Sequence, residues 1–382
     1  MNPELEKHIH VVSFDIPFPA DYGGVIDVFY KIKALYDIGI KVHLHCFEYG
    51  RKHAKQLENI CYSVHYYPRK KGLSYFINSL PYIVSTRNSQ LLYEELEKDN
   101  YPILYEGLHS TAILHFYDMR KRLNMVRMHN IEHDYYNQLS KSTSHLFKSW
   151  YYKSESEKLK NYEKVLDKAD YILAISHSDN EALSKKYKNV VYVPAFHPNN
   201  QITSIKGRGS YIIYHGNLSV EENEKAVLFL IHNVFSKLQI PCVIAGKKPT
   251  HHIHKAAGRY KHIEIVSDPD KHIMKELIQE AHINILPTFQ STGIKLKLLE
   301  SLAIGRYCVV NKPMVMNTGL ENLVIIKEDP QEIIDKIHQL MGIDFAENEI
   351  ELRQDIWEKQ FVNKYNVNII RGLLGKKQLK GI

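Results

Sequence analysis

The stretch STGIKLKLLESLAIG, residues 291–305, decides how this chain folds. A polar loop with a glycine runs directly into an apolar helical pattern that carries Glu300 in its first half and ends at Gly305. The first turn of a helix has unpaired backbone N–H groups and the positive end of the helix dipole, so such a junction binds anions. Lys295 and Lys297 add positive charge there. An ordinary strand–loop–helix unit with two solvated lysines fits the same residues, so the stretch alone leaves both interpretations open.

Apolar runs of strand length alternate with helical patterns along the rest of the chain. Apolar strands separated by helices predict parallel sheets covered on both faces, so the expected fold class is α/β. A helix is expected over 224–238. The expected strands cover residues 8–14, 41–47, 103–105, 124–127, 171–175 and 190–194 in the first half, and 211–216, 242–246, 263–266, 283–287 and 307–310 in the second.

A polar segment with two glycines, residues 198–210, separates two halves of similar size. We expect a Rossmann-like domain over 1–198, a second over 199–350, and a C-terminal helix within 351–382 that returns to the first domain. In such sheets ligands bind outside the carboxyl ends of the strands, and two facing domains hold the ligand in the cleft between them.

The composition is that of a globular protein with excess positive charge. Of 382 residues, 44% are hydrophobic and 24% charged, and the net charge is +7. No apolar run is long enough to span a bilayer and the N-terminus does not resemble a signal peptide, so we expect a cytoplasmic protein. The four cysteines form no CxxC pair, which predicts free thiols. The charge suits a nucleotide, an anionic lipid surface or nucleic acid, but no nucleic-acid-binding signature is present, so we expect no nucleic-acid partner.

Several loops at expected strand ends carry polar residues. Residues 15–24 end in Gly23 and Gly24 before a helix, which lets a backbone approach a phosphate or makes a plain turn, and no GxGxxG motif is present. The segment HNIEH, residues 129–133, differs from HExxH, and residues 134–136 do not extend a long helical pattern, so we expect no metal. We expect hydrogen bonding to a polar ligand, and a structural histidine with its hydrogen bonds satisfied is the alternative. The serines of 176–179 fit helix capping, and no hydrolase triad is apparent.

Taken in order, these segments resemble the family-4 (group 1) retaining glycosyltransferases of the GT-B fold. The resemblance covers roughly residues 8–365 and is closest in the second half. The matching segments are 19–24, 127–133 and 174–179 in the first half, and 214–218, 223–230, 244–249, 265–268, 285–287, 292–305 and 309–310 in the second.

The resemblance implies a binding site for a nucleotide diphosphate sugar. Glu300 would accept hydrogen bonds from the ribose hydroxyls, and a carboxylate can accept from both at once. Val266 and Ser267 would read the base. His129, as a catalytic residue, would contact the transferred sugar. The remaining residues expected to bind the donor, mostly at the diphosphate and sugar, are Gly23, Gly24, Gly216, Asn217, Lys247, Thr292, Gly293, Ile294, Lys295 and Lys297.

The chain departs from the family pattern at two places. Thr292 stands where the family has its first motif glutamate, so the sugar contacts must differ. Asn217 and a residue near Asn223 stand where many members have an arginine and a lysine that bind phosphate. We expect Lys295 and Lys297 to replace these cations, with Lys295 the better candidate for a catalytic role, because a departing nucleoside diphosphate gains negative charge.

The reaction implied is transfer of a sugar, with hexosyl transfer expected, from a UDP- or GDP-sugar to an acceptor hydroxyl with retained configuration and without a cofactor or metal. The acceptor would be a saccharide or a lipid-linked saccharide, in polysaccharide or lipopolysaccharide synthesis. Residues 69–77 mix basic and apolar side chains and fit either a solvated loop or contact with an anionic membrane, which would make the protein peripheral on the inner face of the cytoplasmic membrane. The alternative is a catalytically inactive GT-B protein that binds sugar nucleotides or a partner. A phosphorylase or a dehydrogenase would need motifs that are missing here.

Overall fold

The computed structural model describes residues 8–143, 145–289, 295–316 and 318–376. The described residues form two compact units. Of the described residues, the first unit contains those in 8–198 and 363–376, and the second contains 199–289, 295–316 and 318–362. Each unit is built on its own parallel sheet.

The first unit has a seven-stranded parallel sheet in the order β3-β2-β1-β4-β5-β6-β7. Buried residues alternate between the two faces, as in β1, where Val11 belongs to one core cluster and Val12 to the other. Both faces are therefore covered, as the apolar strands predicted. The strands are β1 (His8–Ser13), β2 (Lys41–Glu48), β3 (Ser63–Pro68), β4 (Ile103–Glu106), β5 (Asn124–Met128), β6 (Tyr171–Ala174) and β7 (Val190–Tyr192).

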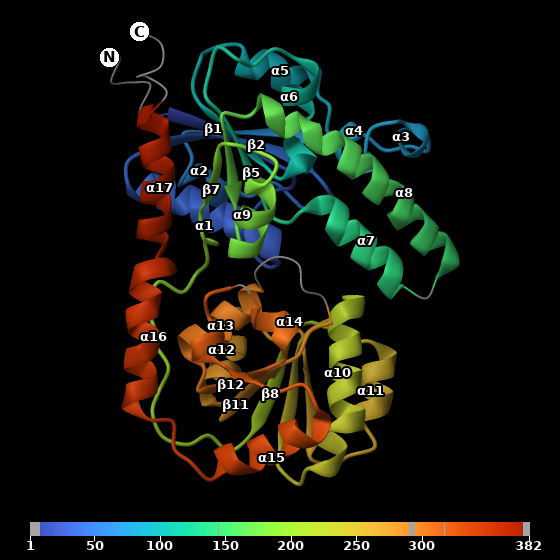
Figure 1. The fold of residues 1–382 in the computed structure, drawn as a ribbon, viewed down its shortest axis with the longest axis vertical. Helices are drawn as coiled ribbons and strands as arrows, with labels where there is room; N and C mark the ends of the chain where they lie inside the picture. Colours follow the sequence, from blue (N-terminus) through green and yellow to red (C-terminus); the bar gives the residue numbers. More distant parts are fainter. Residues whose placement is uncertain (1–7, 144, 290–294, 317, 377–382) are drawn as a thin grey trace. The chain divides into compact units, whose positions relative to one another are not determined.

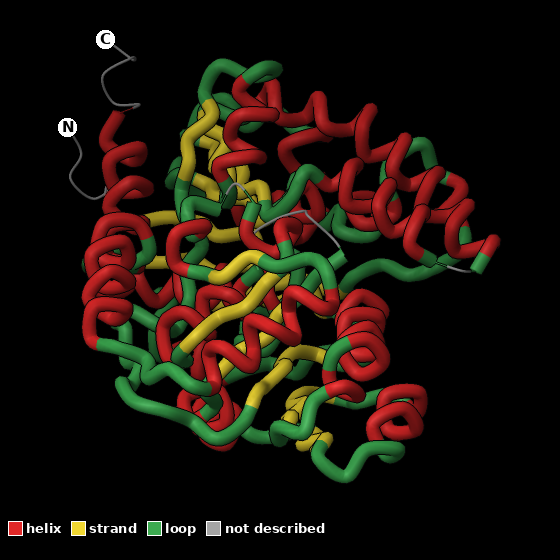
Figure 2. The backbone as a smooth tube through the Cα atoms, turned by 60° about the horizontal axis from the view of Figure 1, so that its bottom comes forward, coloured by secondary structure: helices red, strands yellow, loops and turns green. Residues whose placement is uncertain are grey.

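Helices of the first unit lie on both faces of this sheet. The C-terminal helix α17 (Asn363–Lys376) packs beside α1 (Gly23–Asp37) and buries Val367 and Ile370 in the same core cluster. A long hairpin, α7 (Glu132–Ser142) and α8 (Leu146–Tyr162), extends away from the sheet (Figures 1 and 2). The other helices are α2 (Lys55–Glu58), α3 (Ser74–Ile77), α4 (Tyr82–Ser85), α5 (Gln90–Leu96), α6 (Ala112–Phe116) and α9 (His177–Ser184), with 3-10 turns η2 (Leu108–Ser110) and η3 (Glu163–Lys168).

The second unit has a six-stranded parallel sheet in the order β10-β9-β8-β11-β12-β13. Helices α10 and α11 lie on one side of it and α12 and α13 on the other (Figure 1). The strands are β8 (Ile212–Asn217), β9 (Cys242–Lys247), β10 (Ile263–Ser267), β11 (Ile283–Leu286), β12 (Tyr307–Val310) and β13 (Ile325–Ile326). The helices are α10 (Glu221–Asn233), α11 (His251–Ala257), α12 (Lys271–Glu280), α13 (Leu296–Ile304), α14 (Lys312–Val315), α15 (Pro330–Met341) and α16 (Glu347–Gln360), with 3-10 turns η4 (Phe235–Lys237) and η5 (Glu321–Leu323).

The expected α/β architecture of two Rossmann-like domains is confirmed, with differences in detail. The pattern missed β3, whose sequence SVHYYP is half-buried and polar because it lies at a sheet edge, and the two-residue strand β13. The expectation that residues 134–136 do not continue a helix is wrong, because α7 starts at Glu132. The sequence of α7, EHDYYNQLSKS, is mostly polar and has few strongly apolar residues, so apolar spacing gave little signal for a helix there. All four cysteines are free, as predicted.

Candidate functional site

Two glycines fix the geometry at the carboxyl end of the second sheet. Gly216 at the end of β8 has a φ of +155°, and it is paired in register with Gly246 of β9. A Cβ atom on Gly246 would lie 1.8 Å from the Gly216 carbonyl oxygen, so only glycine fits there. The two strand ends thus come close together without side chains, and the backbone of Gly216 stays partly exposed while Gly246 is buried.

Asn217, Asn223, Tyr214 and Lys297 form a hydrogen-bonded group beside these glycines. The Asn223 side-chain amide donates to the Asn217 carbonyl at 2.8 Å, and the Tyr214 hydroxyl donates to Asn223 Oδ1 at 3.1 Å. Lys297 Nζ lies 2.9 Å from Asn223 Oδ1 and 3.1 Å from the Tyr214 hydroxyl, over the Tyr214 ring. The Lys297 ammonium is therefore held by neutral oxygens.

Lys295 has a different environment. It is the N-cap residue of α13, and its Nζ lies 3.6 Å from Glu222 Oε1. The same carboxylate oxygen of Glu222 accepts a hydrogen bond from the Thr288 hydroxyl. The charge of Lys295 is thus matched by a carboxylate.

Burial shifts the pKa of both lysines. The pKa of Lys297 falls to about 8, chiefly through burial and with a smaller repulsion from Lys295, while Glu222 opposes the shift. Burial also lowers the pKa of Lys295, and Glu222 counteracts it. Among the described residues, Lys295 is the one of the two in an ion pair with Glu222, and the hydrogen-bond partners of Lys297 are neutral, which reverses the order of preference that spacing alone suggested.

Glu300 lies on α13 three residues after Lys297, so the two share a face of the helix. Burial raises the pKa of its carboxyl group to about 7, and Lys271 opposes this shift. Within the described part of the chain Glu300 has no hydrogen-bond or ion-pair partner. Its oxygens are therefore available to hydroxyl donors.

Helix α13 is fixed to the sheet by buried polar contacts. His215 Nε2 lies 2.8 Å from the Ser301 hydroxyl, and burial lowers the pKa of His215 to about 3, so its ring is neutral. A Cβ atom on Gly305 would lie 2.4 Å from the Asn284 amide, so glycine lets the end of α13 approach β11. The position of Lys297 and Glu300 relative to the strand ends is therefore set by packing.

The carboxyl ends of β9 and β10 form a second part of this edge. Ser267 pairs with Gly246, and Val266 with Ala245. The adjoining Lys248 and Asp268 both have positive φ, and Asp268 Oδ1 accepts from the Lys248 backbone at 3.0 Å. Val266 is half-buried, and Ser267 and Lys247 are exposed. All three lie at the carboxyl ends of their strands, at the same end of the sheet as Gly216. Thr292, Gly293 and Ile294 lie outside the described residues.

In the first unit, His129 belongs to a buried network of charges. Its Nε2 lies 2.9 Å from Glu106 Oε2, and its Nδ1 lies 4.0 Å from Asp27 Oδ2. Lys31 bridges the carboxylates of Asp27 and Glu106 at 2.8 and 2.9 Å, and Arg127 binds Asp27 through two nitrogens at 2.9 and 3.2 Å. Two cations and two anions thus balance each other.

The carboxylates of this network stay ionised. Burial alone would raise the pKa of Asp27, but Arg127 and Lys31 outweigh it and hold the pKa far below its usual value. The pKa of Glu106 is lowered against burial in the same way by Lys31 and His129. Asp27, Glu106 and His129 have spacings that could hold a metal ion. Because the Lys31 ammonium already lies between both carboxylates, the donor set has no need of a metal.

Gly23 and Gly24 start α1, and that helix has no side-chain N-cap and no acidic residue in its first turn. A Cβ atom on Gly24 would lie 2.7 Å from Phe14 Cζ, so this glycine makes room for the Phe14 ring, which packs against His129. A Cβ atom on Gly23 would meet nothing within 4 Å. Packing therefore accounts for Gly24, and a phosphate contact by either glycine stays a prediction.

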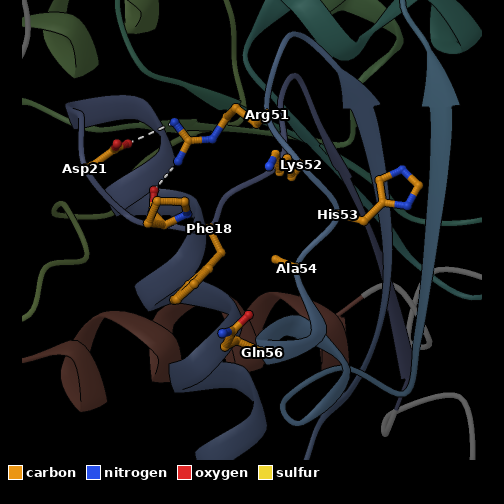
Figure 3. A pocket seen from close by; sticks show the side chains of 8 residues that line it. Phe18, Asp21, Arg51, Lys52, His53, Ala54 and Gln56 are labelled. Atoms are coloured by element: carbon orange, nitrogen blue, oxygen red, sulfur yellow. Dashed lines mark hydrogen bonds and ion pairs between the residues drawn. The ribbon is translucent and has the colours of Figure 1, made fainter.

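A surface depression of about 380 Å³ lies beside the start of α1. Figure 3 shows Arg51 reaching across it to Asp21 and to the Pro19 carbonyl, with Phe18 and Ala54 lower in the depression. The Arg51 to Asp21 hydrogen bond measures 2.9 Å. Arg51 is thus paired within the loop that it closes.

Sequence reasoning missed Glu132 and Asp179 as members of one group in the first unit. Burial, reinforced by Asp179, raises the pKa of Glu132 to about 8, and burial raises that of Asp179 to about 6. The buried Oδ2 atom of Asp179 has no hydrogen-bond partner among the described residues. These residues follow β5 and β6, and the parallel order of the two strands was the signal that could have grouped them.

Comparison with known proteins shows what the second unit is similar to. Residues 209–342 match the family described as "Glycosyl transferases group 1". The chain is also 25% identical over 342 residues to an uncharacterized 44.6 kDa protein in the cps region of Klebsiella pneumoniae, covering 84% of this chain and 88% of that protein.

Solved structures with similar folds cover nearly the whole chain. Sucrose-phosphate synthase from Thermosynechococcus elongatus has a TM-score of 0.70 at 13% identity, over 98% of this chain and 100% of that one. TarM from S. aureus, solved with UDP, has a TM-score of 0.67 at 10% identity, over 97% of this chain and 100% of that one. Anabaena HepE, solved with UDP and glucose, has a TM-score of 0.64 at 11% identity, over 96% of this chain and 99% of that one. The chain has the GT-B architecture of two Rossmann-like domains, and residues 209–342 of its second unit are similar to the group 1 glycosyltransferases.

Proposed function

We propose that the protein is a glycosyltransferase that transfers a hexose from a nucleotide diphosphate sugar to an acceptor hydroxyl, with retention of the anomeric configuration. The observation that carries the proposal is Lys297, a half-buried lysine whose hydrogen-bond partners among the described residues are neutral oxygens, in the segment that matches the group 1 glycosyltransferases. A cation held by neutral oxygens in a site of low dielectric favours an anionic ligand. Similar folds solved with UDP support the donor class.

The proposed transfer step places negative charge on the leaving diphosphate, close to Lys297. The bond between the sugar C1 atom and the phosphate oxygen breaks, and its electron pair goes to the leaving diphosphate. The acceptor oxygen bonds to C1, and its proton passes to the leaving phosphate oxygen. Lys297 stabilises the growing negative charge of the diphosphate, so it lowers the energy of the transition state more than that of the ground state. Lys295 adds to the positive electrostatic potential at the diphosphate while its ammonium remains paired with Glu222.

Glu300 would bind the nucleotide ribose. Its carboxylate, which has no partner among the described residues, lies one helical turn from Lys297, close to the separation between a ribose and its phosphates. The half-buried backbone of Gly216 would lie against the diphosphate. Ser267 and Val266, at the neighbouring strand end, would then face the base.

The acceptor would be a saccharide or a lipid-linked saccharide. A role in cell-surface polysaccharide or lipopolysaccharide synthesis is supported by the similarity to a protein of a cps region. We place the protein in the cytoplasm, peripheral to the membrane that carries such acceptors. The unpartnered oxygen of Asp179 in the first unit is a candidate to bind an acceptor hydroxyl.

The test is turnover of donor by purified protein. UDP- and GDP-linked hexoses are first screened by thermal shift, because a ligand that binds only the folded state raises Tm. Release of nucleoside diphosphate from the donor that stabilises the protein is then measured with and without acceptor extracts. We expect Lys297→Met to lower kcat/KM about a hundredfold, as loss of one preorganised charge does. Lys275→Met, at an exposed lysine of α12, is the matched control and should leave it unchanged. Binding without turnover in any extract would favour the inactive sugar-nucleotide-binding protein instead.

A further inference from the structure

Six large apolar side chains stand exposed on neighbouring elements of the first unit. At the start of α8, Leu146 is 88% exposed, Phe147 79% and Trp150 66%. At α3, Leu73 is 80% exposed, Phe76 39% and Ile77 86%. We call these six residues the tip patch. Exposed aromatic and aliphatic groups in this number mark an interaction surface.

The two halves of the patch are joined by direct contacts. The Phe76 ring packs edge-on against Tyr151 of α8, with centroids 5.6 Å apart, and Lys158 of α8 donates to the Phe76 carbonyl at 2.7 Å. Phe147 and Trp150 lie with their rings 6.1 Å apart. Helix α3 is therefore held against α8, the helix whose first turns carry the other three side chains.

The patch is carried on a preformed support. The Ser149 hydroxyl donates to the Ser140 carbonyl at 2.6 Å, and the Ser156 hydroxyl donates to the His133 carbonyl at 2.7 Å. These bonds tie α8 to α7 at both ends of the hairpin, which projects from the body of the first unit (Figures 1 and 2). The half of the patch on α8 therefore stands on a projecting hairpin.

The surroundings of the patch are basic. The chain has 43 acidic residues among 382, yet none occurs in residues 59–93 or 135–154, the segments that carry the patch. Exposed lysines stand there instead, namely Lys70, Lys71, Lys141, Lys148 and Lys153. Apolar side chains among lysines match a surface that is apolar inside and anionic at its face.

We propose that the tip patch inserts into an anionic lipid bilayer and holds the protein at the membrane surface. The apolar groups leave water for the acyl region, and the lysines contact the lipid phosphates. None of the helices in the described ranges is long and apolar enough to cross a membrane, so the attachment would be peripheral. Pairing with a second copy is disfavoured, because it would bring five lysines on each side together.

This inference deepens the membrane location in the proposed function, and it is measured without enzymatic turnover. The full-length protein is mixed with phosphatidylcholine vesicles that contain either about 30% phosphatidylglycerol, which makes their surface strongly anionic, or none. Tryptophan emission reports insertion, because the chain has two tryptophans and the other, Trp357, is only 1% exposed. We expect a blue shift and sedimentation with the anionic vesicles, and at least about tenfold weaker binding to the neutral ones.

Paired variants separate the apolar contribution to vesicle binding from the contribution of the lysines. Replacing Leu146 and Phe147 by Gln should abolish the blue shift, whereas Leu352→Gln, at an exposed leucine of α16, should not change it. Replacing Lys141, Lys148 and Lys153 by Gln should weaken binding about a hundredfold at low salt. Equal binding to neutral and anionic vesicles, no binding to either, or dimerisation through the patch in sedimentation equilibrium would each overturn the proposal. Donor turnover by the Leu146 and Phe147 double variant, measured without vesicles, stays as in the wild type, so failure at the membrane is distinguishable from failure of the transferase proposal.

Discussion

The pKa values at the second sheet predict a bell-shaped pH dependence of kcat/KM. Glu300 must be ionised to accept hydrogen bonds from ribose hydroxyls, and burial raises its pKa to about 7. Lys297 must be protonated to stabilise the diphosphate, and burial lowers its pKa to about 8. The active protonation state therefore dominates only in the narrow range between these two values.

The size of the effect follows from the two pKa values. At pH 7.5 about 60% of the free enzyme has both groups in the required state, and at pH 5.5 or 9.5 about 3% does. We therefore expect kcat/KM to be roughly twentyfold lower at either extreme than at pH 7.5. In the profile of kcat the basic limb should move to higher pH, because bound diphosphate favours the charged ammonium.

The assay is initial-rate release of nucleoside diphosphate over pH 5.5–9.5 (roughly two pH units on either side of the optimum), with circular dichroism at each pH to show that the protein stays folded. Lys297→Met should remove the basic limb, and Glu300→Gln should remove the acidic one, while each also lowers the plateau. If either variant keeps both limbs, the group assigned to the missing limb does not control activity, and the reasoning from burial is refuted.

Three further predictions concern stability. Asp27→Asn leaves Arg127 and its neighbouring lysine without their buried carboxylate, so urea denaturation should show a loss of about 3–5 kcal/mol; a loss below about 1 kcal/mol would contradict the buried network. Gly246→Ala places a methyl group against the Gly216 carbonyl and should cost about 3 kcal/mol or more; a melting temperature equal to that of the wild type would show that β8 and β9 are not so close. Burial and neighbouring imidazoles hold the pKa of His45 well below its ordinary 6.5, so the unfolded state binds a proton that the folded state does not, and the free energy of unfolding should fall as pH drops below about 6.5, by up to about 1.4 kcal/mol per pH unit. Removing this histidine with His45→Gln should flatten that dependence, and an unchanged slope would assign it to other groups.

Much of the fold was accessible from sequence because apolar runs report burial directly. The strand pattern of β1, β2 and β8 to β12 identified the sheets, since a strand covered on both faces must be apolar along its length. Strand β3 was not predicted from the sequence because an edge strand keeps polar side chains, such as His65. Helix α7 was not predicted because its sequence, EHDYYNQLSKS, is mostly polar and offers few apolar residues from which a period could be recognised.

The candidate site was accessible in part. The junction before α13 and the carboxylate of Glu300 could be singled out, because residue type and spacing place them at a helix entry. The different electrostatic environments of Lys295 and Lys297 could not be predicted from the sequence. They stand two residues apart with the same chemistry, and only their partners, Glu222 for one and Asn223 with Tyr214 for the other, give them different electrostatic roles.

The sequence by itself determined which segments are buried, where parallel strands end, and that anion-binding residues stand at the entry to α13. Tertiary structure alone decided which charges are paired. It brought Asp27, Glu106 and Arg127 from three elements into one balanced network, and it left the ammonium of Lys297 among neutral oxygens. The physical reason is that burial is a property of each residue, which composition and periodicity record, whereas electrostatic energy depends on distances between residues far apart in the chain.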